Sequence, residues 1–181
     1  MKKLMMALAI VATAAVVQAA SFDWKTGATG KIYEAGTTTL LASGTAYIFD
    51  AAANSQQSVL DAFSQSKTWT TGNLASKAVT SGAIAADTAN PFTYGTSGNS
   101  YDFYVVLVDG DNIFISDTVP GAASDVGTKQ VSFSLKTASQ LAASTSSTFT
   151  AGGWYSAVPE PTSGLLLLLG MAGLALRRKQ A

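Results

Sequence analysis

The sequence YDFYVVLVDGDNIFIS, residues 101–116, is the strongest local signal of structure in this chain. It contains a run of aromatic and β-branched residues, then the pair Asp109-Gly110, then a second apolar run that ends at Ser116. Asp-Gly is a preferred two-residue hairpin turn because glycine adopts positive φ without strain. Both faces of the two strands are apolar near the turn. We therefore expect burial on both sides, in the centre of a sandwich or against a helix.

Short aromatic and β-branched clusters extend this pattern in both directions, separated by small polar residues. The further strands that we predict are residues 30–33, 37–41, 45–50, 131–136 and 147–150. One helix is predicted after a cap at Asn54 or Ser55, because Val59, Leu60 and Phe63 recur at helical spacing. Residues 74–86 favour strand or irregular structure, and residues 138–147 a loop or a short helix. The sequence thus predicts a mainly β, sandwich-like antiparallel domain with one short helix, flanked by two separate apolar helices, one at each end of the chain.

The charges are divided unevenly between the ends and the middle of the chain. Of 11 Lys and Arg residues, five lie near the ends, whereas residues 20–157 contain six lysines, ten acidic residues and no arginine. This net charge near −4 excludes a nucleic-acid binder, which needs clustered basic residues. The chain has no Cys and no His. It therefore has no disulfides and no thiolate metal site, and it lacks the commonest general base.

The first 19 residues have the features of a secretory signal peptide. Lys2 and Lys3 precede an apolar run, residues 4–17, and Val17 and Ala19 suit the −3 and −1 positions of a signal-peptidase site. We predict cleavage after Ala19, with Ala20 as the second choice. A permanent membrane anchor is the alternative, but 14 residues reach only about 21 Å along a helix, short of a hydrocarbon core of about 30 Å.

The last 24 residues, 158–181, have three parts in a fixed order. The parts are the motif Val158, Pro159, Glu160 and Pro161, the apolar residues 164–176, and the basic cluster Arg177, Arg178 and Lys179. Two prolines favour an extended motif that cannot join a helix. An apolar helix would enter the bilayer, and the basic cluster would stop transfer on the cytoplasmic side. This order leaves the proline motif at the outer face, within reach of a membrane-embedded enzyme.

The three-part tail resembles the PEP-CTERM sorting domain over residues 158–179. The resemblance implies processing by exosortase, a membrane transpeptidase of Gram-negative bacteria, at or beside Pro159-Glu160-Pro161. It also implies an association with the cell surface and with exopolysaccharide or biofilm matrix. An uncut C-terminal anchor is one alternative. A Gram-positive sortase signal is another, but it requires an LPxTG-type motif that this chain lacks.

Matches to catalytic motifs are weak. Ser64 to Lys67 fits S-x-x-K and Lys25 to Gly27 fits K-T-G, but their order is opposite to that of penicillin-binding enzymes. Residues 95–99 fall short of G-x-S-x-G, and without His there is no triad base. No spacing selects a carboxylate pair for glycoside hydrolysis. We therefore predict no enzymatic activity, no catalytic residue and no cofactor.

Two binding interpretations remain open. Asp109, Asp111 and Asp117 surround the hairpin and could supply oxygen ligands to Ca²⁺, although Asp-Gly is also ordinary turn chemistry, and we predict no metal site. Aromatic residues could instead line a sugar-binding face, although aromatics in a small β domain more often form the core. The candidates are Trp24, Trp69, Trp154, Tyr33, Tyr94 and Tyr101.

The division of the chain follows from these signals: a signal peptide (1–19), a β-rich passenger domain (20–157) and a sorting signal (158–181). Residues 152–157 are either the end of the domain or a spacer. The expected function is a non-catalytic structural role at the cell envelope or in the extracellular matrix, after transient residence in the inner membrane. A carbohydrate-binding module in an exopolysaccharide matrix is the alternative. The expected partners are the Sec machinery, signal peptidase, exosortase and the membrane, with exopolysaccharide in the alternative, and no nucleic acid.

Overall fold

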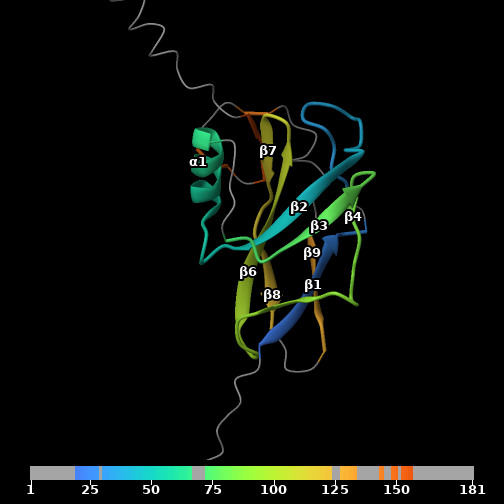
Figure 1. Ribbon diagram of the computed structural model, residues 1–181, viewed down its shortest axis with the longest axis vertical. Coiled ribbons are helices and arrows are strands. Elements are labelled where there is room, and N and C mark those ends of the chain that lie inside the picture. Colours follow the sequence, from blue (N-terminus) through green and yellow to red (C-terminus); the bar gives the residue numbers. More distant parts are fainter. Residues whose placement is uncertain are drawn as a thin grey trace, which may run out of the picture.

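The computed structural model describes residues 19–28, 30–66, 72–123, 127–133, 143–144, 148–150 and 152–156. These ranges contain one helix and ten strands (Figure 1). In chain order they are β1 (Ala20–Thr26), β2 (Ser43–Asp50), α1 (Gln56–Ser66), β3 (Ala75–Thr80), β4 (Ala83–Ile84), β5 (Phe92–Tyr94), β6 (Ser100–Asp109), β7 (Asn112–Ile115), β8 (Val119–Ala122), β9 (Lys129–Phe133) and β10 (Gly153–Ser156).

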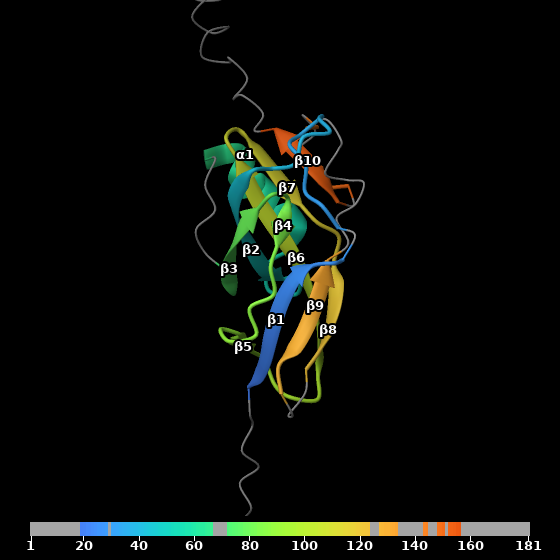
Figure 2. The same cartoon turned by 90° about the vertical axis from the view of Figure 1, so that its right-hand side faces the viewer.

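The strands form two sheets around a shared core (Figure 2). The larger sheet has the order β10-β7-β6-β2-β3-β4, with β8 also paired to β6, and the smaller sheet has the order β5-β1-β9. The prediction of a mainly β domain with antiparallel sheets and one short helix is confirmed. One pair departs from it, since β1 and β9 run parallel.

The hairpin at residues 101–116 is the centre of the larger sheet, as predicted. Asp109 pairs with Asn112, and Gly110 between them has a φ of +56°. The strands are buried on both faces. One face contributes Phe103, Val105, Leu107 and Phe114 to the core between the sheets, and the other contributes Tyr104, Val106, Ile113 and Ile115 to a second core. Both environments proposed from the sequence therefore occur, one on each face.

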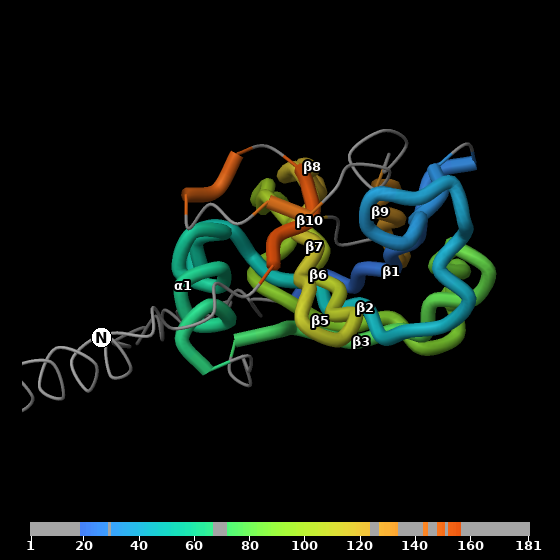
Figure 3. Tube along the Cα trace, turned by 90° about the horizontal axis from the view of Figure 1, so that it is seen from above, coloured from blue at the N-terminus to red at the C-terminus, as the bar shows by residue number. Residues whose placement is uncertain are grey.

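The second core lies under α1, which covers the outer face of the larger sheet (Figure 1, Figure 3). The helix begins after Ser55, whose hydroxyl accepts a hydrogen bond from the amide of Ser58 at 3.1 Å. This bond satisfies one of the amides that a helix start leaves unpaired. Val59, Leu60 and Phe63 are buried against the sheet, so the predicted apolar stripe is confirmed.

Two of the five other predicted strands are found, and three are wrong. Residues 45–50 lie within β2, and residues 131–133 complete β9, whereas residues 134–136 lie outside the described ranges. Residues 30–33 and 37–41 form a loop with a single bridge, Tyr33 to Leu40. Their apolar side chains fold this loop around the β3–β4 turn instead, where the Ile32 amide donates to the Gly82 carbonyl at 2.9 Å.

The C-terminal strand β10 corrects the spacer interpretation of residues 152–157. Residues 153–156 pair with β7, and Trp154 and Tyr155 are each only 1% exposed. The Trp154 ring packs edge-on against Phe114, with ring centroids 5.6 Å apart. Residues 148–150, expected to be a strand, are irregular, and the Thr150 amide donates to the Tyr155 hydroxyl at 2.9 Å. The pair of buried aromatics makes β10 part of the folded domain.

The remaining strands were not specifically predicted. β3 and β4 lie in the ambiguous residues 74–86, and β1, β5 and β8 were missed. The predicted signal helix and C-terminal apolar helix fall outside the described residues. No helix within the described ranges is long and apolar enough to cross a membrane.

Gly82 in the β3–β4 turn gives a prediction about backbone strain. It has a φ of +68°, and an added Cβ would lie 2.5 Å from the Ile32 carbonyl oxygen. Gly110 has a similar φ of +56° but open space around its Cα, so it is the matched control. Gly110→Ala should lower the free energy of unfolding by about 1 kcal/mol, because alanine is strained in a left-handed backbone. Gly82→Ala should suffer the same loss and, because of the clash, an additional loss of about 1 to 3 kcal/mol. Urea unfolding of both variants measures the difference, and equal losses would contradict the close approach.

Candidate functional site

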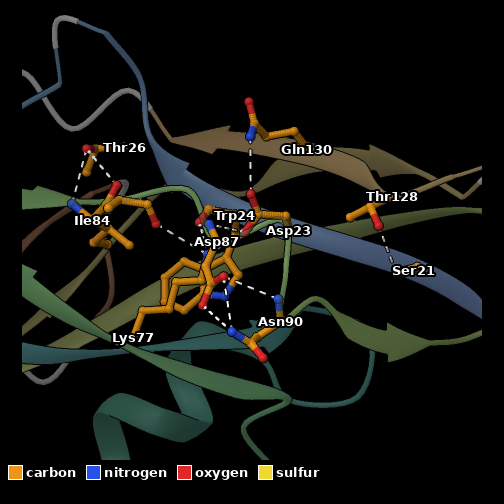
Figure 4. Close-up of polar contacts among 11 residues, drawn as sticks. Ser21, Asp23, Trp24, Thr26, Lys77, Ile84, Asp87, Asn90, Thr128 and Gln130 are labelled. Carbon is orange, nitrogen blue, oxygen red and sulfur yellow. Dashed lines mark hydrogen bonds and ion pairs between the residues drawn. The ribbon is translucent and has the colours of Figure 1, made fainter.

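A buried ion pair in the described chain joins Asp23 on β1 to Lys77 on β3 (Figure 4). The carboxylate of Asp23 is fully buried, and the side chain of Lys77 is 13% exposed. Lys77 projects inward from a strand that β4 covers only at Val79 and Thr80. An inward charge on a partly uncovered strand is a known protection against edge-to-edge aggregation.

Both members of this pair make several hydrogen bonds. The Lys77 ammonium donates to the Asp23 carboxylate, to the Trp24 carbonyl at 2.7 Å and to the Ala85 carbonyl at 3.3 Å. Asp23 also accepts from the Asp87 amide at 3.1 Å and from the Gln130 side chain at 3.2 Å. The ammonium lies 5.6 Å from the centre of the Trp24 ring, within range of a cation–π contact. The pair therefore links β1, β3, β9 and the segment after β4.

Opposing effects act on the acidity of Asp23. Burial alone would raise its pKa, but hydrogen bonds from Lys77, Asp87, Gln130 and the backbone of Trp24 hold the pKa below its ordinary value. The carboxylate is therefore charged at neutral pH. A general base would need a free lone pair and a pKa near the working pH, so this group suits a structural role better than a catalytic one.

A shallow depression of about 380 Å³ lies beside this pair. Its lining is mostly alanine, from β3, β4 and the segment that leaves β4, and its polar groups come from Lys77, Thr80 and Asp87. The Asp87 carboxylate bonds to the side chain of Asn90 at 3.0 Å. The depression is thus small and its lining mostly aliphatic, and both of its charged side chains, Lys77 and Asp87, already have partners.

The metal and catalytic candidates are not assembled into sites. Within the described part of the chain, no group of three or more acidic side chains is placed to hold a metal ion, so Asp109, Asp111 and Asp117 do not form a Ca²⁺ cage. Ser64 lies on α1 and Lys25 to Gly27 lie at the end of β1, while Lys67 is outside the described residues.

The aromatic residues do not form an exposed platform in the described structure. Trp24 and Trp154 are buried in the core, and Trp69 lies outside the described residues. Tyr94 and Tyr101 are partly buried and pack edge-on against each other, with ring centroids 5.3 Å apart. Their hydroxyls are engaged, since Tyr94 donates to Asp50 at 2.5 Å and Tyr101 accepts from the Thr96 amide at 2.7 Å.

The bond from Tyr94 to the buried Asp50 gives a pH-dependent prediction. The bond raises the pKa of Tyr94 to about 12, whereas the pKa of tyrosine in the unfolded chain is about 10. The neutral tyrosine therefore contributes its full stabilisation below pH 10, and this stabilisation is lost as the pH rises from 10 to 12. Tyr94→Phe should cost about 1 to 3 kcal/mol at pH 7. The difference from wild type should close above pH 10 in chemical denaturation. Tyr33→Phe is the control, because the Tyr33 hydroxyl makes no hydrogen bond to another described residue. A difference in unfolding free energy between wild type and Tyr94→Phe that stays constant with pH would contradict the prediction.

The predicted processing sites lie at or beyond the borders of the described domain. Ala19 is exposed directly before β1, and Val17 lies outside the described residues. The motif Val158, Pro159, Glu160 and Pro161 and the basic cluster Arg177, Arg178 and Lys179 also lie outside them. The structure does place their attachment point, since β10 ends at Ser156.

Comparison with protein families identifies the segment after β10. Residues 157–179 match the PEP-CTERM protein-sorting motif. The chain carries this sorting signal, as the sequence predicted. PEP-CTERM signals mark exported proteins that are processed at the membrane, and they imply exosortase as the processing partner. No curated protein and no solved structure matches the chain.

The Asp23–Lys77 pair was missed by the sequence analysis. Asp23 lies in a strand that was not predicted, and its partner is 54 residues away. The one local signal is a carboxylate between two aromatic residues, Phe22 and Trp24, both fully buried. A charge placed among core residues generally needs a partner.

Proposed function

We propose that this chain is an exported, non-catalytic structural protein of a Gram-negative cell envelope or extracellular matrix, sorted there by exosortase. The PEP-CTERM motif at residues 157–179 carries the proposal. The chain would pass through the inner membrane transiently, held by its C-terminal apolar segment, and then reach the cell surface or matrix.

The chemistry of the domain supports a structural role. Its most buried charges, Asp23 and Lys77, are joined to each other and to the backbone. The exposed positions of the strands are mostly Ser, Thr and Ala, a surface compatible with a soluble exported domain. These buried groups stabilise the fold.

The start of β1 supports removal of the signal peptide after Ala19. Ala20 is fully buried and pairs with Tyr94 of β5. Cleavage after Ala20 would remove the first residue of this strand. The proposed mature domain thus begins with the first residue that the fold uses.

Substitution within the motif tests the sorting proposal. In the native host, replacing Pro159, Glu160 and Pro161 together by alanine should trap the protein in the membrane fraction with its tail attached. Thr162→Ala, directly after the motif, is the matched control and should be processed like wild type. Immunoblots of membrane, surface and secreted fractions measure the outcome. Normal processing of the triple variant would contradict exosortase recognition of this motif.

The alternative function is a carbohydrate-binding module within an exopolysaccharide matrix. The depression beside Lys77 and Asp87 is the feature that favours it, whereas burial of Trp24 and Trp154 removes the usual stacking surface. Titration of the protein with exopolysaccharide from its host would show saturable binding that Thr80→Trp, which fills the depression, abolishes. Binding that this substitution leaves unchanged would rule out the depression as the site.

A further inference from the structure

The proposed signal-peptidase site borders the folded domain without a spacer. Ala19 is exposed, whereas Ala20, the residue after the scissile bond, is fully buried and is the first residue of β1. Ala20 pairs with Tyr94 of β5, and Ser21 pairs with Thr93. The peptide bond that signal peptidase would cut therefore joins an exposed residue directly to a paired strand.

β1 is fixed along its whole length. It lies between β5 and β9 in the smaller sheet, and within the described part of the chain β5 and β9 pair with no other strand (Figure 2). Phe22 packs against Phe92 and Phe103, with ring centroids 5.6 and 5.1 Å apart, and Trp24 is fully buried in the same core. Withdrawing β1 would separate β5 from β9 and expose Phe22 and Trp24. The smaller sheet therefore exists only while β1 is docked.

The ion pair on β1 opposes withdrawal of the strand as well. The carboxylate of Asp23, close behind Ala20 in the sequence, contacts the Lys77 ammonium and accepts hydrogen bonds from the Asp87 amide and the Gln130 side chain. Removing this carboxylate would leave the largely buried Lys77 without its counter-charge, and separating a buried pair in this way is strongly unfavourable. The start of β1 therefore cannot fray far while the domain is folded.

A protease needs the opposite state of the same segment. Proteases cut exposed, mobile segments, and they act on a folded protein mainly through its local openings. The enzyme must hold residues on both sides of the scissile bond, so the first residues of β1 have to leave the sheet. When opening is fast compared with cleavage, the cleavage rate is proportional to the population of the open form. A docked β1 and a cleavable bond therefore exclude each other.

We infer that signal peptidase must act before β1 docks, so that removal of the signal peptide precedes completion of the smaller sheet. This inference rests on the proposed cleavage after Ala19 and adds the order of two steps to it. A chain that completes its fold first keeps its signal segment and stays attached to the membrane through its N-terminal end. Burial of Ala20 thus makes early cleavage a condition for release of the folded domain.

Cleavage of the full-length precursor by purified bacterial signal peptidase in detergent micelles tests this order. Cell-free synthesis without the peptidase supplies the uncut chain, and near-ultraviolet circular dichroism shows whether its domain is folded. The folded precursor should be cut at least about 100-fold more slowly than the variant Phe103→Asp, which places a charge against Phe22 in the core and prevents docking of β1. Mass spectrometry should locate the cut between Ala19 and Ala20.

An insertion variant separates burial of the site from other effects of folding. The sequence Ser-Gly-Ser-Gly-Ser-Gly-Ser-Ala is inserted between Ala20 and Ser21. The cleavage site is then unchanged, and the last inserted alanine takes the place of Ala20 in β1. The bond now lies in an exposed, flexible segment outside the sheet. The folded insertion variant should therefore be cut about as fast as Phe103→Asp.

The other outcomes overturn the inference. Rapid cleavage of the folded wild-type precursor would show that β1 opens readily, and slow cleavage of the folded insertion variant would show that burial of Ala20 is not the cause. Either result would leave the proposed signal peptide standing. If the peptidase cuts none of the three chains, including the unfolded Phe103→Asp, the proposed signal peptide and the inference both fail.

Discussion

Trp154→Ala is expected to lower the free energy of unfolding by about 3 to 5 kcal/mol, the usual cost of removing a large buried aromatic side chain. Trp154 is 1% exposed and packs against Phe114 in the core between the sheets. Domains of this size are stable by about 5 to 15 kcal/mol, so the loss is a large share of the total. The effect is large because one side chain holds β10 to the sheet as well as filling the core.

Chemical denaturation of purified wild type and variant measures this loss. Phe149→Ala is a suitable control, since Phe149 is only partly buried beside the second core, and it should cost clearly less. A loss below about 1 kcal/mol for Trp154→Ala, within the range of surface substitutions, would show that β10 is a dispensable spacer.

Lys77→Met should be comparably damaging, at about 3 to 5 kcal/mol, because it leaves the buried Asp23 carboxylate without its cation. Hydrogen bonds from Asp87 and Gln130 remain, but they do not neutralise the charge. The double variant Asp23→Asn with Lys77→Met should recover part of the loss, since it removes the unpaired charge. A double variant no more stable than Lys77→Met alone would contradict the ion pair as the cause.

The loss in Lys77→Met should depend on pH in a defined direction. The folded-state pKa of Asp23 is lowered, so its contribution to stability is present above the ordinary carboxyl range and is lost as the pH falls through the lowered value. The difference in unfolding free energy between wild type and Lys77→Met should therefore be largest near neutral pH and should become smaller below about pH 4. Thermal melts from pH 3 to pH 7 measure it.

The parts of the fold that were predictable are those whose signals are local. The hairpin at residues 101–116 was found because an Asp-Gly turn separates two apolar runs, and α1 because Ser55 precedes three apolar residues at helical spacing. Each signal lies within a few residues of the structure that it specifies.

The strands that were missed depend on distant partners. β1 is a strand because it pairs with β5 and β9, about 70 and 107 residues further along the chain. β8 contains Pro120, which argues against a strand by local rules but is tolerated because, among the described strands, β8 pairs only with β6. In contrast, residues 37–41 are rich in β-branched residues yet form a loop, because the chain packs around Gly82.

The functional signals divide in the same way. The sorting motif is a linear feature, so Val158 to Pro161 could be identified from the sequence alone, and the family match agrees. The Asp23–Lys77 pair joins residues that only the tertiary structure brings together. The same holds for Ser156, which pairs with Asn112 beside the β6–β7 turn.

The intact mass of the protein recovered from its native host, measured separately in membrane and secreted fractions, is the direct test of sorting by exosortase. We expect a mature form that begins at Ala20 and ends within or beside Pro159-Glu160-Pro161, in the surface or secreted fraction. A mass that retains residues 164–181 in every fraction would show that the tail is only an anchor, and it would contradict sorting by exosortase.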